Sequence, residues 1–130
     1  MGEAKVLVVD DDAGFRAYVR AALGEDRYRV LEAATGQAGV ELAVRERPDV
    51  ILLDWRMPGQ SGIATCRSLR EHDALGGVRI AMVTGLDDER DRALARHAGA
   101  DAFLVKDGDA VSLMTQVRRL LDAVAAERGV

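Results

Sequence analysis

The sequence contains one cysteine, Cys66, and it lacks any long hydrophobic run. A single cysteine excludes an internal disulfide and suits the reducing environment of the cytoplasm. No apolar run approaches the ~20 residues that a membrane-spanning helix needs. The first residues also lack the basic and then apolar pattern of a secretory signal. We therefore expect a cytoplasmic protein that does not bind or enter a membrane.

Clustered positive charge is absent as well. The formal net charge is -4, and the 18 lysines and arginines do not gather into a basic stripe. Proteins bind nucleic acids through several Lys and Arg contacts to phosphates, so we expect this chain to bind no nucleic acid. The 130 residues, 48% of them hydrophobic, suit one globular domain over residues 1–130 with a core at about 4–126.

Five short apolar runs alternate with five helical patterns along the chain. The apolar runs are continuous, which is typical of strands buried on both faces of a parallel sheet; they cover 5–9, 29–33, 50–53, 78–83 and 102–105. The helical patterns cover about 15–23, 35–47, 62–71, 87–99 and 111–124. This alternation predicts an α/β fold with a parallel sheet, helices on both faces and right-handed crossovers.

Short polar residues and glycine mark several expected helix ends. Asp12 suits the start of the first helix, Thr35 that of the second and Asp87 that of the fourth. Such side chains accept hydrogen bonds from the free amides of a first helical turn. Gly24 is suited to end the first helix, since glycine readily adopts the backbone conformation that follows a helix.

Polar side chains follow the expected strands at the point where each strand ends. The first strand is followed by Asp10 and Asp11, the third by Asp54, the fourth by Thr84 and the fifth by Lys106. Functional sites of open parallel sheets lie at this carboxyl edge, near the point where the strand order reverses. We therefore expect three carboxylates, a hydroxyl and an ammonium group to converge there.

This set of groups suits phosphoryl transfer to a carboxylate. Neighbouring carboxylates repel each other unless a cation joins them, and Mg²⁺ binds through one or two carboxylates while it recruits phosphate oxygens. A carboxylate can itself attack phosphorus, and the transfer mainly requires positioning and charge neutralisation. Asp54 is therefore the candidate phosphoryl acceptor, with Mg²⁺, Lys106 and the Thr84 hydroxyl around the transferred group.

Four segments resemble the CheY-like receiver domain of response regulators in two-component signal transduction. They are VLVVDDD (6–12), ILLDWRMPGQSG (51–62), AMVTG (81–85) and AGADAFLVK (98–106), in the order and at the spacing of that family. The resemblance covers essentially the whole chain. It implies a flavodoxin-like fold, with a doubly wound five-stranded parallel sheet of order 2-1-3-4-5 flanked by five helices. It also implies a switch rather than an enzyme, because a receiver catalyses only its own phosphorylation and dephosphorylation.

The resemblance assigns a phosphoryl acceptor and a metal site. It implies that Asp54 takes a phosphoryl group from a phosphohistidine of a sensor histidine kinase or a histidine phosphotransfer protein. Asp11, Asp54 and the backbone carbonyl of Arg56 resemble the direct Mg²⁺ ligands, and Asp10 resembles the outer acidic partner that acts largely through water.

The resemblance also assigns the residues that carry the signal. Thr84 resembles the hydroxyl that follows the phosphoryl group, Lys106 the phosphate-contacting lysine and Phe103 the switch aromatic. Phosphorylation would then change the face formed by the fourth helix, the fifth strand and the fifth helix. That face would select a downstream protein or an output domain that is not in this chain. The sequence leaves open whether two copies pair through it.

Three positions depart from the family, and two other functions stay open. Arg56 lies two residues after Asp54, where we expect it to alter the dephosphorylation rate or the choice of partner. Phe103 replaces the more frequent tyrosine, and Asp107 stands where the family usually has proline after a cis bond. A non-proline cis bond costs about 3 kcal/mol, so a receiver-like interaction module that works without phosphorylation is one alternative. The other is a Mg²⁺-dependent phosphohydrolase resembling the haloacid dehalogenases. That pattern has a second Asp where this chain has Arg56.

Overall fold

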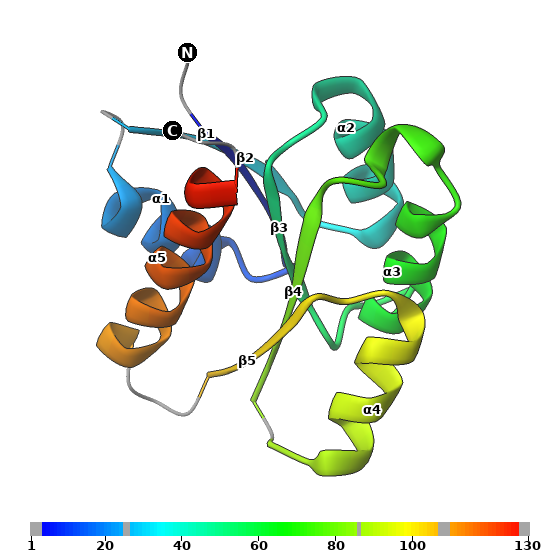
Figure 1. The fold of residues 1–130 in the computed structure, drawn as a ribbon. Helices are drawn as coiled ribbons and strands as arrows, with labels where there is room; N and C mark the ends of the chain where they lie inside the picture. The colour runs from blue at the N-terminus through cyan, green and yellow to red at the C-terminus, as the bar shows by residue number, and fades with distance from the viewer. Residues whose placement is uncertain (1–3, 25–26, 86, 107–109, 128–130) are drawn as a thin grey trace.

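The computed structural model describes residues 4–24, 27–85, 87–106 and 110–127 (Figure 1). Asp107 and the peptide bond before it lie outside these residues, so the expected change at this bond stays untested. Strands and helices alternate along the described chain: β1 (Ala4–Val9), α1 (Ala13–Leu23), β2 (Tyr28–Ala33), α2 (Gly36–Glu46), β3 (Val50–Asp54), α3 (Gly62–Arg70), the short 3₁₀ helix η1 (Asp73–Leu75), β4 (Arg79–Thr84), α4 (Glu89–Ala98), β5 (Ala102–Val105) and α5 (Ala110–Glu127).

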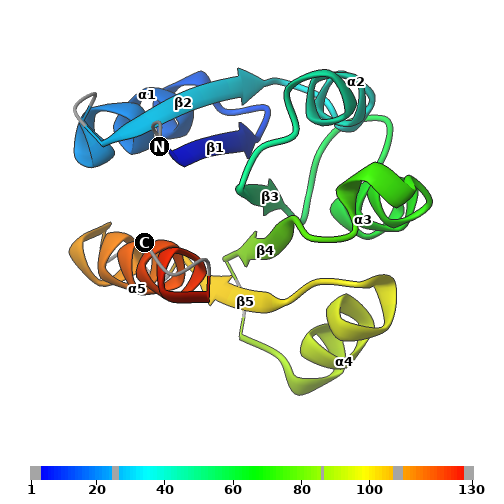
Figure 2. The same cartoon turned by 45° about the horizontal axis from the view of Figure 1, so that its top comes forward.

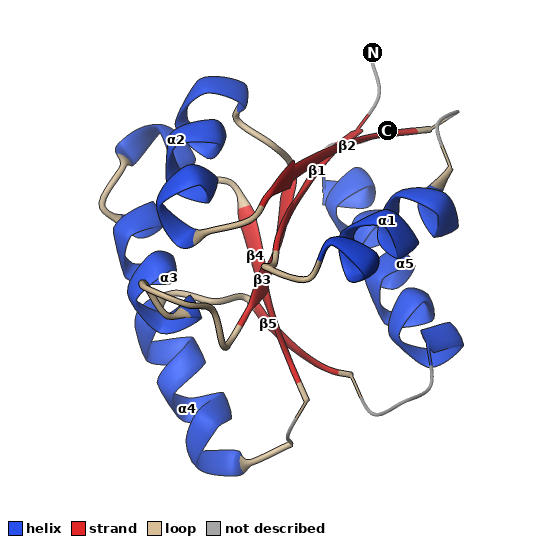
Figure 3. Cartoon of the chain, turned by 180° about the vertical axis from the view of Figure 1, so that it is seen from behind, coloured by secondary structure: helices blue, strands red, loops and turns tan. Residues whose placement is uncertain are grey.

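The strands form one parallel sheet in the order β2-β1-β3-β4-β5. Figure 2 shows this order from β2 at one edge to β5 at the other. Helices α1 and α5 cover one face of the sheet, and α2, α3 and α4 cover the other (Figures 1 and 3). The predicted fold class is therefore confirmed, and the strand order reverses between β1 and β3.

The sheet separates two hydrophobic clusters. In β1, Val6 and Val8 belong to the cluster under α1 and α5, whereas Leu7 and Val9 belong to the cluster under α2, α3 and α4. Successive side chains of a strand point to opposite faces, so a strand covered on both sides must be apolar at every position. All four of these residues have no solvent exposure, which explains the continuous apolar run of the sequence.

Three of the four expected helix ends are confirmed. The Asp12 carboxylate accepts hydrogen bonds from the amides of Gly14 and Phe15, at 2.9 and 3.3 Å. The Thr35 hydroxyl accepts one from the amide of Ala38 at 3.1 Å. Gly24 follows α1 with a positive φ of 75°.

The prediction that Asp87 caps the fourth helix was wrong. The Asp88 carboxylate caps α4 by accepting a hydrogen bond from the Arg90 amide at 2.8 Å. Asp87 instead accepts one from Arg92 Nε at 2.7 Å. Either of two adjacent aspartates satisfies the capping pattern, and here the ion pair with Arg92 engages the first.

None of the helices in the described part of the chain is both long and apolar enough to cross a bilayer.

The packing around Asp54 depends on a close approach between α3 and the end of β3. The Gly62 amide donates to the Trp55 carbonyl at 2.9 Å. A Cβ at Gly62 would overlap the Asp54 carbonyl oxygen and lie 2.9 Å from Trp55 Cα. Because both neighbours are backbone atoms, a side chain there would displace the strand end that carries Asp54.

We expect Gly62→Ala to lower the free energy of unfolding by about 1–3 kcal/mol, the usual cost of overpacking. The matched control is Gly77→Ala, because a Cβ at Gly77 meets no atom within 4 Å. Urea unfolding of both variants measures the difference. A loss at Gly62 no larger than at Gly77 would show that the strand end accommodates a side chain.

Candidate functional site

Three carboxylates meet at the carboxyl ends of β1 and β3. The two strands pair side by side, with Val9 opposite Leu53, so Asp10 and Asp54 emerge next to each other. One oxygen from each of Asp10, Asp11 and Asp54 lies within 4.8 Å of the other two. Asp10 is 1% exposed, Asp54 is half-buried and Asp11 is exposed, so the cluster opens to solvent on the side of Asp11.

Lys106 brings the positive charge that the sequence predicts for this edge. Its ammonium nitrogen lies 2.8 Å from Asp10 Oδ2 and 3.8 Å from Asp54 Oδ1. The same nitrogen lies 3.9 Å from the centroid of the Phe15 ring. The backbone amide of Lys106 donates to the Thr84 carbonyl at 2.6 Å, which ties the end of β5 to the end of β4.

The remaining predicted site residues lie on neighbouring segments. Thr84 ends β4 and is 5% exposed, one residue beyond the Val83 that pairs with Asp54. Arg56 lies exposed in the loop after β3. Phe103 is half-buried on β5. The structure thus gathers the three carboxylates with Lys106 and sets the other three residues around them.

The Phe103 ring contacts the side chains of Trp55 and Arg92. The Trp55 ring meets it edge-on, with centroids 6.2 Å apart and planes at 78°. The Arg92 guanidinium carbon lies 4.8 Å from the Phe103 centroid. Arg92 pairs in turn with Asp87, which lies in the segment between β4 and α4. Phe103 is therefore connected through Arg92 to the segment that follows Thr84.

The pKa of Asp54 is raised from its usual 3.8 to about 6. Burial is the largest cause, and the negative charge of Asp10 adds to it. Lys106 opposes this rise, and Asp11 contributes further repulsion. The pocket therefore holds more negative charge than its one ammonium group balances.

These residues fit a hard divalent cation. All three carboxylates offer oxygen, the ligand atom that Mg²⁺ prefers, and Mg²⁺ keeps several waters when only one or two carboxylates bind it directly. Oxygens bound to one Mg²⁺ lie at most about 4.2 Å apart, because each is about 2.1 Å from the ion. The three oxygens lie within 4.8 Å of one another, which is compatible with an ion held directly by part of the set and through water by the rest.

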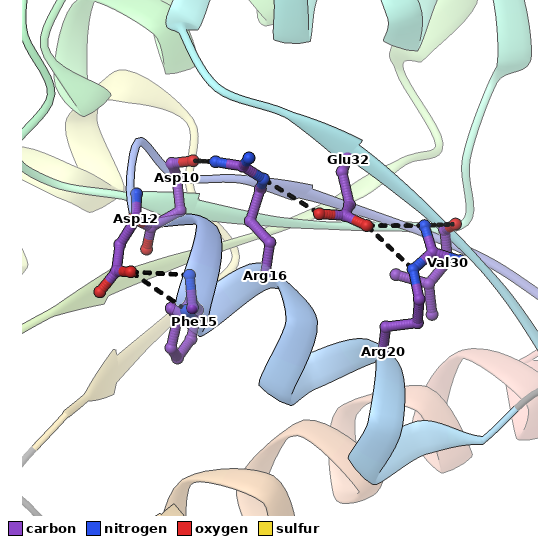
Figure 4. Close-up of polar contacts among 8 residues, drawn as sticks. Asp10, Asp12, Phe15, Arg16, Arg20, Val30 and Glu32 are labelled. Carbon is purple, nitrogen blue, oxygen red and sulfur yellow. Dashed lines mark hydrogen bonds and ion pairs between the residues drawn. The ribbon is translucent and has the colours of Figure 1, made fainter.

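A network of charged residues beside the site, formed by Arg16, Arg20 and Glu32, was not predicted from the sequence (Figure 4). Arg16 on α1 donates through Nη1 to the Asp10 carbonyl at 2.6 Å and through Nε to Glu32 at 3.0 Å. Arg20 donates through Nε to the other Glu32 oxygen at 2.9 Å. The available signal was Glu32 itself, since a charged residue inside an apolar strand run indicates a partner.

Glu32 is held as a charged group by these two arginines. Burial alone would raise the pKa of Glu32, but hydrogen bonds and charge from Arg20 and Arg16 outweigh it and lower the pKa below its usual value. The carboxylate therefore stays ionised and fixes both guanidinium groups.

Comparison with known sequences gives one family. A sequence model described as the response regulator receiver domain matches residues 6–118. The chain is 37% identical over 117 residues to response regulator PleD of Caulobacter vibrioides, which covers 90% of this chain and 26% of PleD. It is 33% identical over 118 residues to protein PilH of Pseudomonas aeruginosa, and the match covers 91% of this chain and 98% of PilH. The chain spans about half or less of the length of the first curated relatives it matches.

Comparison with solved structures gives the same result. The chemotaxis response regulator CheY4 of Vibrio cholerae superimposes with a TM-score of 0.83 at 30% identity, covering 91% of this chain and 98% of CheY4. The five-stranded sheet and its helices therefore match a solved receiver structure.

We expect Asp54→Asn to stabilise the metal-free protein at neutral pH. Because the folded-state pKa of about 6 exceeds the usual 3.8, the ionised carboxylate opposes folding. This opposition is absent below about pH 3.8 and complete above about pH 6. The free energy of unfolding should therefore rise by about 1–2 kcal/mol at pH 7.5 in EDTA, a discounted conversion of the pKa shift.

Urea unfolding at pH 7.5 and at pH 4, with EDTA and with Mg²⁺, measures this effect. The gain should shrink at pH 4 and when Mg²⁺ is present. The control is Asp73→Asn, an exposed carboxylate in η1. A gain that is the same at both pH values would show that ionisation of Asp54 in the pocket is not its cause.

Proposed function

The chain belongs to the response regulator receiver family of two-component signalling, and on that premise we propose that it is a switch driven by phosphorylation of Asp54. A receiver domain is not a conventional enzyme, so the phosphohydrolase alternative is not supported. The observation that carries the proposal is the convergence of Asp10, Asp11, Asp54 and Lys106 at the carboxyl ends of β1, β3 and β5.

Asp54 is the member of the cluster best suited to accept the phosphoryl group. Asp10 is 1% exposed and already bonded to Lys106, whereas Asp54 is only half-buried and has Lys106 at 3.8 Å. In the proposed step an Asp54 oxygen forms a bond to phosphorus as the phosphorus–nitrogen bond of a donor phosphohistidine breaks. The imidazole leaves with the bonding electrons, and the donor side chain returns to neutral histidine after protonation.

Mg²⁺ is the proposed cofactor. Asp11, Asp54 and the backbone carbonyl of Arg56 would hold it directly, and Asp10 would act through water, since its two carboxylate oxygens already accept hydrogen bonds from the Asp12 amide and Lys106. The ion supplies positive charge to the phosphoryl oxygens. Lys106, whose ammonium nitrogen lies 3.8 Å from Asp54 Oδ1, would supply a second positive charge.

The signal would leave the site through Thr84 and Phe103. A phosphoryl group adds a charge of about −1.5 to −2, which attracts the Thr84 hydroxyl and the Lys106 ammonium group. Movement of the segment after Thr84 would disturb the Asp87–Arg92 pair, and Arg92 would then release the Phe103 ring. The result is a shift between two packings of the α4–β5–α5 face.

The proposed partners follow from this chemistry. A sensor histidine kinase or a histidine phosphotransfer protein donates the phosphoryl group in the cytoplasm. A downstream protein, or an output domain outside this chain, reads the α4–β5–α5 face. That the chain binds no nucleic acid itself stays a prediction from its charge pattern.

We expect the protein to gain one phosphoryl group when it is incubated with Mg²⁺ and acetyl phosphate or phosphoramidate. Intact-mass spectrometry detects the gain. Asp54→Asn should abolish it, EDTA should prevent it and Asp73→Asn should leave it unchanged. If neither donor nor a phosphorylated histidine kinase adds a group, the chain is instead an interaction module that works without phosphorylation.

Arg92→Gln tests how the signal reaches Phe103. The substitution removes both the cation over the ring and the ion pair with Asp87. We therefore expect the unphosphorylated variant to populate the activated packing several-fold more than wild type. The aromatic NMR signals of Phe103 and its ring contacts with Trp55 measure this population. Arg96→Gln on the same helix is the control, and identical Phe103 signals in both variants would refute the connection.

A further inference from the structure

Four hydrogen bonds hold Asp10 in place. The proposed chemistry leaves one of them unexplained, the bond from the Arg16 side chain. The Asp10 amide donates to the Ala33 carbonyl at 3.0 Å. Its carboxylate accepts from the Asp12 amide at 2.9 Å and from Lys106 at 2.8 Å. Its carbonyl accepts from Arg16 at 2.6 Å. This last bond is made by a long side chain that reaches the site from α1.

The Asp10 carbonyl belongs to the peptide unit that joins Asp10 to Asp11. A peptide unit is planar, so a hydrogen bond that fixes its carbonyl also fixes the direction in which the chain enters Asp11. Asp11 is exposed, and among the described residues its carboxylate receives no hydrogen bond. The peptide unit therefore sets where the Asp11 side chain leaves the backbone, and which positions its carboxylate can reach.

Arg16 is itself fixed before any ion binds. Its guanidinium group uses Nη1 for the Asp10 carbonyl and Nε for Glu32 on the neighbouring strand β2. Its side chain is 16% exposed. The second Glu32 oxygen is engaged by Arg20, so Glu32 cannot easily turn away (Figure 4). A planar guanidinium fork held in this way sets both position and angle at the carbonyl.

We propose that Arg16, oriented by Glu32, is a positioning residue for the cation and phosphoryl site. It acts through the Asp10–Asp11 peptide unit and does not contact the ion or the phosphoryl group. The inference rests on the proposed function, since it concerns the ion of the same site. Groups that orient metal ligands from behind typically change metal affinity about 10–100-fold when they are removed.

Arg20 offers a matched control inside the same network. It lies one turn further along α1 and binds the same Glu32 carboxylate through Nε. It also donates to a backbone carbonyl, that of Val30, at 2.9 Å. Val30 lies in the middle of β2, away from the strand ends that form the site. Arg20→Gln therefore removes the same kinds of hydrogen bond as Arg16→Gln but leaves in place the bond from Arg16 to the Asp10 carbonyl.

The experiment compares Mg²⁺ affinity and stability in the two variants. Mg²⁺ is titrated into the full chain while the emission of Trp55, its one tryptophan, is followed, and calorimetry provides an independent dissociation constant. Urea unfolding in EDTA gives the stability of each variant. We expect similar losses of stability in both variants. Arg16→Gln should raise the Mg²⁺ dissociation constant about tenfold, whereas Arg20→Gln should change it less than twofold.

Two further arms keep the inference falsifiable. Arg16→Lys retains a positive charge but loses the planar fork of the guanidinium group, so its Mg²⁺ affinity should lie between those of wild type and Arg16→Gln. If Arg16→Gln does not fold, Arg16→Lys takes its place in the Mg²⁺ titration. Uptake of phosphate from acetyl phosphate by Arg16→Gln should be slow at low Mg²⁺ and recover toward the wild-type rate at saturating Mg²⁺.

The outcomes separate the two proposals. Equal Mg²⁺ affinity in Arg16→Gln and Arg20→Gln would show that Arg16 is only structural, even if wild type is phosphorylated normally. Failure of the wild-type chain to take up a phosphoryl group would refute the proposed function, and the Mg²⁺ titrations would still decide the role of Arg16.

Discussion

Three carboxylates share a half-buried pocket with a single ammonium group, and the other features of the site follow from this imbalance of charge. Burial, with added repulsion from Asp10 and Asp11, raises the pKa of Asp54 to about 6, and Lys106 lies 2.8 Å from Asp10 and 3.8 Å from Asp54. A protein that retains such repulsion without a cation loses stability. A divalent cation bound among the three carboxylates would relieve this repulsion.

The sheet is what forces these groups together. Parallel pairing of β1 with β3 brings Asp10 beside Asp54, and pairing of β3 with β4 sets Thr84 one residue past Asp54. The strands behind these residues are buried on both faces, so their register is fixed by two hydrophobic clusters at once. The close contact of α3 at Gly62 limits the position of the Asp54 end further. The carboxylates are thus held together by packing that does not depend on the ion.

Much of this was predictable from the sequence, because the signals are local. Continuous apolar runs identify the strands, and the residue after each run identifies what reaches the carboxyl edge. Prediction failed where two local solutions were equivalent, as at Asp87 and Asp88, and the choice depended on Arg92 one turn away. It also missed Arg16, whose bonds to Asp10 and Glu32 join segments far apart along the chain. No periodic pattern encodes such a contact; only the misplaced charge of Glu32 pointed to it.

The division of the interior by the sheet has a consequence for how such a molecule can move. The cluster under α1 and α5 includes most of the apolar residues of α5 and the face of β1 and β3 that points toward them. Phe103 and Trp55 pack against the other cluster, with α4. Repacking around α4 therefore disturbs one half of the interior, while the other half continues to hold the strands in register. Strand β5 contributes Phe103 to the cluster under α4 and Leu104 to the cluster under α5, so it is the strand through which a change in one layer would reach the other.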